Sequence, residues 1–141
     1  MKGKIHIKLF NQGIVVIVDN SVNSAILKYK PNTDTLVKVS EGYFDSAVGC
    51  STWFYENEFF IPCIVLTEES DFNTIIHESS HTTFKIMDGL GMPNTEDNEE
   101  IFCYLNGYIS QETIIMLLKK DYVKIKDNKG KEYKLVERGD A

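Results

Sequence analysis

The feature that most constrains the fold is a change in hydrophobic pattern near residue 70. Before this point, short apolar runs typical of strands cover residues 5–10, 14–18, 36–39, 50–55 and 59–66. After it, apolar residues recur every three or four positions, which is typical of amphipathic helices. This spacing holds from residue 72 to 88 and again from about 95 to 118. The pattern predicts an α+β fold, in which residues 1–68 are mainly strands and residues 70–119 form two helices.

The strand runs predict a mostly antiparallel sheet. The polar residues 56–58 separate two apolar runs, as expected for a hairpin. The continuous β-branched run at 14–18 predicts a strand buried on both faces, whereas residues 20–29 fit neither pattern. Alternation over residues 122–136 predicts that the tail, 120–141, is a β-hairpin. The length of 141 residues suits a single domain, 1–141.

Polar and turn-forming residues mark the ends of the two helices. Ser70 or Asp71 can cap the first helix, and Gly89, Gly91 and Pro93 predict its end. Asn94 or Thr95 can cap the second helix. Because the connection is short, we expect the two helices to be antiparallel neighbours.

Composition excludes several classes of function. The formal net charge is −6, which argues against a nucleic-acid partner. The cysteines Cys50, Cys63 and Cys103 are odd in number and form no CxxC pair, so neither a disulfide framework nor a cysteine zinc site is expected. The N-terminus has no apolar signal core, and no apolar run reaches the length of a membrane span. We therefore expect a cytoplasmic protein without a membrane partner.

The residues that carry chemistry are His77, Glu78 and His81. Histidines four positions apart lie on one face of a helix, where both can hold a single Zn²⁺. Glu78 is placed to accept a proton from zinc-bound water, which is the logic of the HExxH motif. The alternative is a solvent-facing histidine pair beside a surface acid.

A catalytic zinc usually has three protein ligands and one water. The only other histidine, His6, lies far off in the first strand, so the third ligand is expected to be an acid. Glu99 and Glu100 lie in the second predicted helix, and Glu100 follows His81 by 19 positions. Acids in a first helical turn also favour the helix dipole without any metal. Asp88 shares the histidine face and is better placed as an outer partner of the site than as a ligand, but we favour the simpler interpretation of an acid at the end of the helix.

Over residues 72–110 the chain resembles gluzincins, and it is similar to very small phage- or prophage-encoded gluzincin-like proteins. The resemblance implies a zincin-like domain that hydrolyses peptide bonds, with zinc held by His77, His81 and a glutamate. In the family pattern an aromatic residue follows the ligand glutamate by four positions, and Glu100 and Tyr104 match it. We favour Glu100 also because it shares a helix face with Gly107, which would allow the two helices to approach closely.

The resemblance further implies that a family strand rims the cleft, with residues 59–66 as its counterpart. Ser79, Ser80 and Ile101 depart from the family pattern, and no residue matches a transition-state histidine. Tyr104 and Tyr108 are candidates to donate to an oxyanion, although an aromatic stripe on such a helix more often belongs to the core.

These observations predict a zinc metallopeptidase with Glu78 as general base and a peptide or protein as substrate. One alternative is a catalytically idle, zinc-binding interaction protein of phage origin, and another is a plain interaction domain. A homo-oligomer formed through edge strands stays open.

Overall fold

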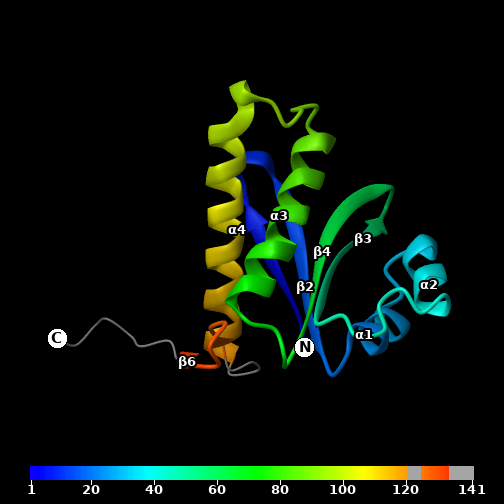
Figure 1. Ribbon diagram of the computed structural model, residues 1–141. Helices are drawn as coiled ribbons and strands as arrows, with labels where there is room; N and C mark the ends of the chain where they lie inside the picture. Colours follow the sequence, from blue (N-terminus) through cyan, green and yellow to red (C-terminus); the bar gives the residue numbers. More distant parts are fainter. Residues whose placement is uncertain (121–124, 134–141) are drawn as a thin grey trace.

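The computed structural model describes residues 1–120 and 125–133 (Figure 1). Its first half contains β1 (Lys2–Ile7), η1 (Lys8–Phe10), β2 (Gln12–Asp19), α1 (Val22–Tyr29), α2 (Thr33–Ser40), β3 (Gly49–Glu56) and β4 (Phe59–Thr67). Its second half contains α3 (Phe72–Gly89), η2 (Glu96–Asn98), α4 (Glu99–Lys120), β5 (Ile125–Lys126) and β6 (Glu132–Tyr133). The fold is α+β, as the sequence predicts.

The four long strands form one sheet in the order β1-β2-β4-β3. β1 and β2 are antiparallel, β3 and β4 form the predicted antiparallel hairpin, and β2 and β4 pair in parallel. The sheet is therefore mixed: two of its three strand pairs are antiparallel, in line with the expectation of a mostly antiparallel sheet, and one pair is parallel. The parallel pair joins the two most apolar strands, and their side chains are buried on both faces of the sheet.

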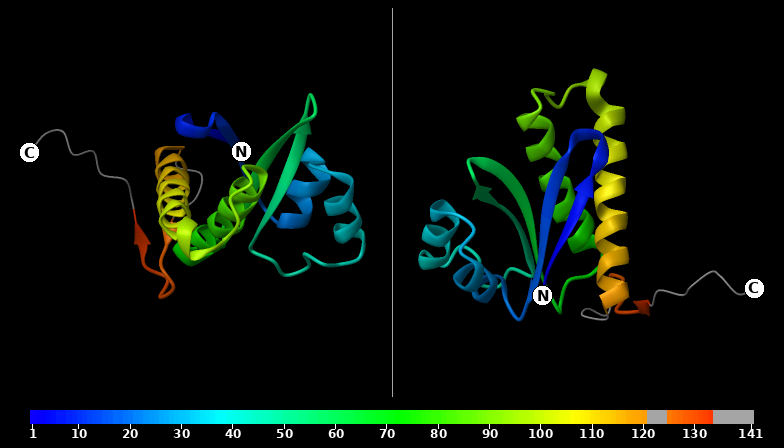
Figure 2. Two further views of the ribbon diagram at one scale, coloured as in Figure 1. Left: turned by 90° about the horizontal axis from the view of Figure 1, so that it is seen from above. Right: turned by 180° about the vertical axis from the view of Figure 1, so that it is seen from behind.

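Helices cover both faces of the sheet, as the views in Figure 2 show. The sheet lies between two hydrophobic cores, and alternate residues of β2 belong to one core or the other. Ile14, Val16 and Val18 pack in the cluster that includes α3 and α4, whereas Val15 and Ile17 pack in the cluster that includes α1. The continuous β-branched run thus supplies both cores.

The strand predicted at residues 36–39 is wrong, because this segment belongs to α2. Asn32 caps α2, since its side-chain oxygen accepts a 2.8 Å hydrogen bond from the Thr35 amide. Leu36 and Val39 lie one helical turn apart and both pack against the core beneath α1. The ambiguous segment before it forms α1, which Ser21 caps.

α3 and α4 lie side by side and run in opposite directions (Figure 1). Asp71 caps α3, because its Oδ1 accepts a 2.7 Å hydrogen bond from the Thr74 amide. Gly91 has a φ of 71°, a left-handed conformation that suits glycine, just after α3 ends. The predicted pair of antiparallel helices is therefore confirmed.

At the C-terminal end, two-residue strands β5 and β6 pair antiparallel. The rest of the predicted hairpin, residues 122–124 and 134–136, lies outside the described residues. By length and composition alone, the described segment Glu96–Lys120 also satisfies the requirements of a membrane-spanning helix. Mostly buried core helices meet the same test; here 28% of the apolar window is buried, and Leu105, Ile109 and Leu117 of α4 lie in the core beside α3.

Candidate metal centre

Helix α3 brings His77 and His81 together one turn apart. Their Nε2 atoms are 3.2 Å apart, and both side chains are exposed on the outer surface of the helix. The rings meet edge to face, with centroids 4.9 Å apart. The predicted shared face of the two histidines is therefore present in the structure.

The spacing of the two imidazole nitrogens fits a zinc ion. Two nitrogens at the usual zinc–nitrogen bond length on a tetrahedral ion lie about 3.3 Å apart. A hydrogen bond between two neutral imidazoles would give a similar distance, so the spacing is compatible with both interpretations. Glu78 adds a third potential ligand atom, and the three ligand atoms lie within 4.8 Å of one another. The three side chains thus form a group that can hold a metal ion.

Glu78 is not a surface acid. Glu78 is only 5% exposed, and its Oε1 lies 3.7 Å from His77 Nε2. Its Oε2 is buried without a hydrogen-bond partner among the described residues. Burial raises the pKa of the Glu78 carboxyl above its ordinary value, while the histidines and Lys85 oppose the rise. A carboxyl in this environment holds a proton more readily than a solvated one, as a general base must after it has accepted a proton.

The strand beside Glu78 is β3, not β4. β4 lies inside the sheet between β2 and β3, so the prediction that residues 59–66 rim the cleft is wrong. A Cβ atom at Gly49, the first residue of β3, would lie 3.3 Å from Glu78 Cγ and 2.8 Å from Thr74 Cγ2. The absence of a side chain at Gly49 therefore gives Glu78 its place between α3 and β3.

Glu99 and Glu100 lie in the first turn of α4, and both are exposed. The rings of Phe84 and Phe102 are in contact, with centroids 4.6 Å apart, which fixes the level at which the helices meet. Glu100 belongs to α4. When Phe84 and Phe102 are taken as level with each other, Glu100 lies about 7 Å beyond His81, measured along the axis of α3. Glu100 is not a member of the group formed by the histidines, and its role as third ligand stays a prediction.

The structure does not support close helix approach at Gly107, since nothing described lies within 4 Å of a Cβ built there. Tyr104 and Tyr108 line a small pocket with residues of β1 and η1 and none of α3. The structure therefore does not bring either tyrosine to the histidines. His6 lies on β1, where its Nε2 is 3.0 Å from Asn11 Oδ1.

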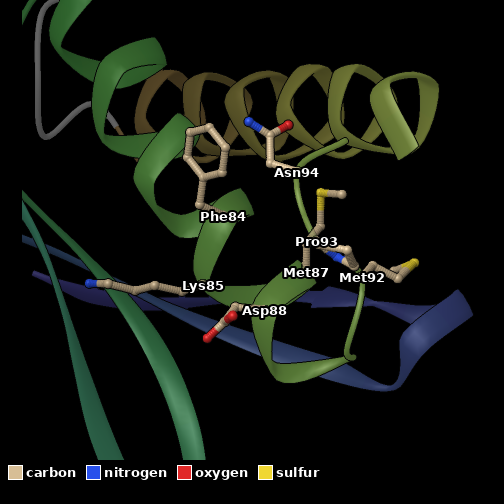
Figure 3. A pocket seen from close by; sticks show the side chains of 7 residues that line it. All are labelled: Phe84, Lys85, Met87, Asp88, Met92, Pro93 and Asn94. Atoms are coloured by element: carbon tan, nitrogen blue, oxygen red, sulfur yellow. The ribbon is translucent and has the colours of Figure 1, made fainter. Parts of the chain in front are cut away.

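A cavity of about 350 Å³ lies at the end of α3 (Figure 3). Its lining comes from α3 and from the loop that leads to α4: Phe84, Lys85, Met87, Asp88, Met92, Pro93 and Asn94. Figure 3 shows Lys85 and Asp88 directed away from the side of α3 that carries Phe84. Asp88 is exposed and is not part of the metal-binding group.

Sequence reasoning missed the polar contacts between α3 and β3. Lys85 Nζ donates a 3.1 Å hydrogen bond to Ser51 Oγ, and Ser51 Oγ lies 3.3 Å from Thr82 Oγ1. One signal was present: Lys85 follows Glu78 by seven positions, so both occupy one side of a helix. The partner strand is not visible in local sequence.

No protein-family model matches the chain, and comparisons with curated proteins and with solved structures give no match.

Proposed function

We propose that the protein is a zinc-dependent peptidase in which His77 and His81 hold the ion and Glu78 is the general base. The observation that carries the proposal is the environment of Glu78. A buried carboxylate with an unpartnered oxygen lies beside two imidazole nitrogens spaced as zinc ligands are. A group that served only to bind metal would not need this buried acid.

Bound zinc lowers the pKa of water and polarises a carbonyl group. The chain supplies the remaining chemistry. Glu78 accepts the proton of the attacking water at its carboxylate and delivers it to the nitrogen of the leaving amine. The low exposure of Glu78 excludes bulk water from this carboxylate, so that its proton passes to the substrate.

β3 supports the proposal because it offers a place for a peptide. It is an edge strand of the sheet and follows the side of α3 that carries Glu78. An extended peptide can add to such an edge through its main-chain hydrogen bonds. This arrangement would hold a peptide bond close to Glu78.

A second candidate is a catalytically idle, zinc-binding interaction protein of phage origin. The observation that favours it is the ligand group itself. The described residues bring together two histidines and Glu78, without a further acid to complete the zinc shell. Cleavage activity separates the two candidates, because both predict zinc binding.

The test is cleavage of a broad peptide library by the zinc-loaded wild type and by Glu78→Gln. Gln keeps the shape of Glu78 and cannot accept the proton, so we expect a loss of at least about 100-fold in kcat/KM. Glu68→Gln, at an exposed acid beyond β4, is the matched control and should cleave normally. Near-normal turnover by Glu78→Gln would exclude Glu78 as the base. A wild type that binds zinc and cleaves nothing would favour the idle protein.

A further inference from the structure

Lys85 is a half-buried cation between α3 and β3. Its Nζ donates to Ser51 Oγ at 3.1 Å and lies 5.2 Å from the centre of the Trp53 ring. The Trp53 ring in turn stacks with the Phe60 ring, with centroids 6.1 Å apart. Ser51 and Trp53 lie two residues apart on β3, so their side chains share the sheet face that α3 covers. Aromatic packing thus holds the ammonium group at one position along β3.

Lys85 has no carboxylate partner within the described ranges. Glu78, on the same side of α3, pairs instead with His77, with Oε1 and Nε2 3.7 Å apart. An ammonium group has three N–H donors, and Ser51 accepts from one of them. Burial lowers the pKa of Lys85 below its ordinary value of 10.5, because the surrounding side chains replace water around the charge. A bound anion would oppose this shift.

The position of Lys85 relative to Glu78 corresponds to a short length of peptide. Glu78 Cγ is close to Gly49, whereas Lys85 Nζ contacts Ser51, two residues further along β3. Two residues of extended chain span about 6.6 Å. A peptide laid along β3 with its scissile bond at Glu78 would therefore place a group about two residues away beside Lys85.

We propose that Lys85, supported by Ser51 and Trp53, binds a carboxylate of the peptide substrate about two residues from the scissile bond. The inference rests on the proposed peptidase function. The carboxylate is either the C-terminal group of a short peptide or the side chain of an acidic residue. The site therefore selects substrates by charge, at a place separate from the group that holds the metal.

The test uses the fluorescence of Trp53, the only tryptophan in the chain. The full-length, metal-free protein is titrated with acetyl-trialanine and with its C-terminal amide. A second pair of blocked peptides carries an internal aspartate or asparagine. We expect one carboxylate peptide to bind about tenfold tighter than its neutral partner. The pair that shows the difference identifies the source of the carboxylate.

Lys85→Met should remove the preference for the carboxylate peptide, and Lys85→Arg should retain most of it because the charge is kept. Lys119→Met, at an exposed lysine in the last turn of α4, is the control and should behave as wild type. If Lys85→Met does not fold, Ser51→Ala is the second variant: it removes the hydroxyl group that accepts from Lys85 and contacts Thr82, and it should weaken the preference. Equal binding of acid and neutral peptides by wild type would overturn the proposal, as would an unchanged preference in Lys85→Met.

The measurement separates this inference from the peptidase proposal, because it needs neither zinc nor turnover. A carboxylate preference that depends on Lys85, in a protein that cleaves nothing, would keep the binding site and refute the peptidase. Cleavage that depends on Glu78, with no such preference in the binding titrations, would keep the peptidase and refute the role of Lys85.

Discussion

Helix α3 has two buried sides of different character. The side that packs on α4 and the sheet is mainly apolar, with Ile75, Ile86 and Met87 at 0–3% exposure, although the small polar residues Ser79 and Thr83 are also buried there. The side that packs on β3 is polar, with Glu78, Thr82 and Lys85 facing Gly49 and Ser51. Both sides lie in one helix and differ only by rotation about its axis.

We infer from this difference that the first side mainly stabilises the fold and that the second side carries the chemistry. Burial of apolar area stabilises the fold on the first side. On the second side, Glu78 Oε2 and Trp53 Nε1 are buried without partners among the described residues, and such groups destabilise a folded protein. Polar groups that weaken the fold are expected where they serve binding or catalysis. The comparison predicts that substitutions on the apolar side lower stability, whereas those on the polar side also change function.

The largest effect is expected for Ile75→Ala on the apolar side. Ile75 is fully buried, and its truncation leaves a cavity that should lower the free energy of unfolding by about 2–5 kcal/mol. Ile76→Ala is the matched control at an adjacent, 45% exposed residue and should cost less than about 1 kcal/mol. Urea unfolding measures both variants. Equal losses would contradict the assignment of the buried side.

Gly49→Ala tests the contact between α3 and β3. The added Cβ would lie 2.8 Å from Thr74 Cγ2 and 3.2 Å from the backbone oxygen of Val65, so the strand or helix must move. We expect a loss of about 1–3 kcal/mol in stability, together with reduced cleavage because Glu78 shifts.

Gly107→Ala, where nothing described lies within 4 Å, is the control for Gly49→Ala. It should raise stability by up to about 1 kcal/mol, because alanine favours a helix. Cleavage should be unchanged. If Gly49→Ala were as harmless, α3 and β3 would not be in close contact at Glu78.

A smaller and opposite effect is expected for Glu78→Gln. Because burial raises the pKa of Glu78, the folded protein binds the proton more readily than the unfolded chain, and ionisation above the ordinary pKa of 4.5 opposes folding. The metal-free Gln variant should therefore be more stable than wild type at pH 7, by roughly 1 kcal/mol. The gain should shrink as the pH falls toward 4.5. Unfolding curves at both pH values check this, and a gain that grew on acidification would contradict the sign.

The sequence predicts the parts of this protein that depend on local spacing. The placement of His77 and His81 follows from their four-residue separation, and the start of α3 follows from the capping residue Asp71. The strand expected at residues 36–39 was wrong because Leu36 and Val39 are also one helical turn apart, and a short apolar segment fits both periods.

Features that depend on packing between distant segments were not predictable. The parallel pairing of β2 with β4 joins strands that are separated in sequence by α1, α2 and β3. The contact of Lys85 with Ser51 requires α3 to lie over β3. The level of Glu100 depends on where Phe84 meets Phe102 in the interface of the helices. Each of these is decided by tertiary packing, which spacing along the chain does not encode.

The most direct test of the account is the zinc affinity of the full-length chain, measured by competition with a chromophoric chelator. We predict one zinc per chain for wild type, and the same affinity in Glu78→Gln within a few fold. His81→Ala removes a ligand and should weaken binding by at least about 100-fold. A wild type that binds no zinc, or a His81→Ala variant that binds it as tightly as wild type, would contradict the account.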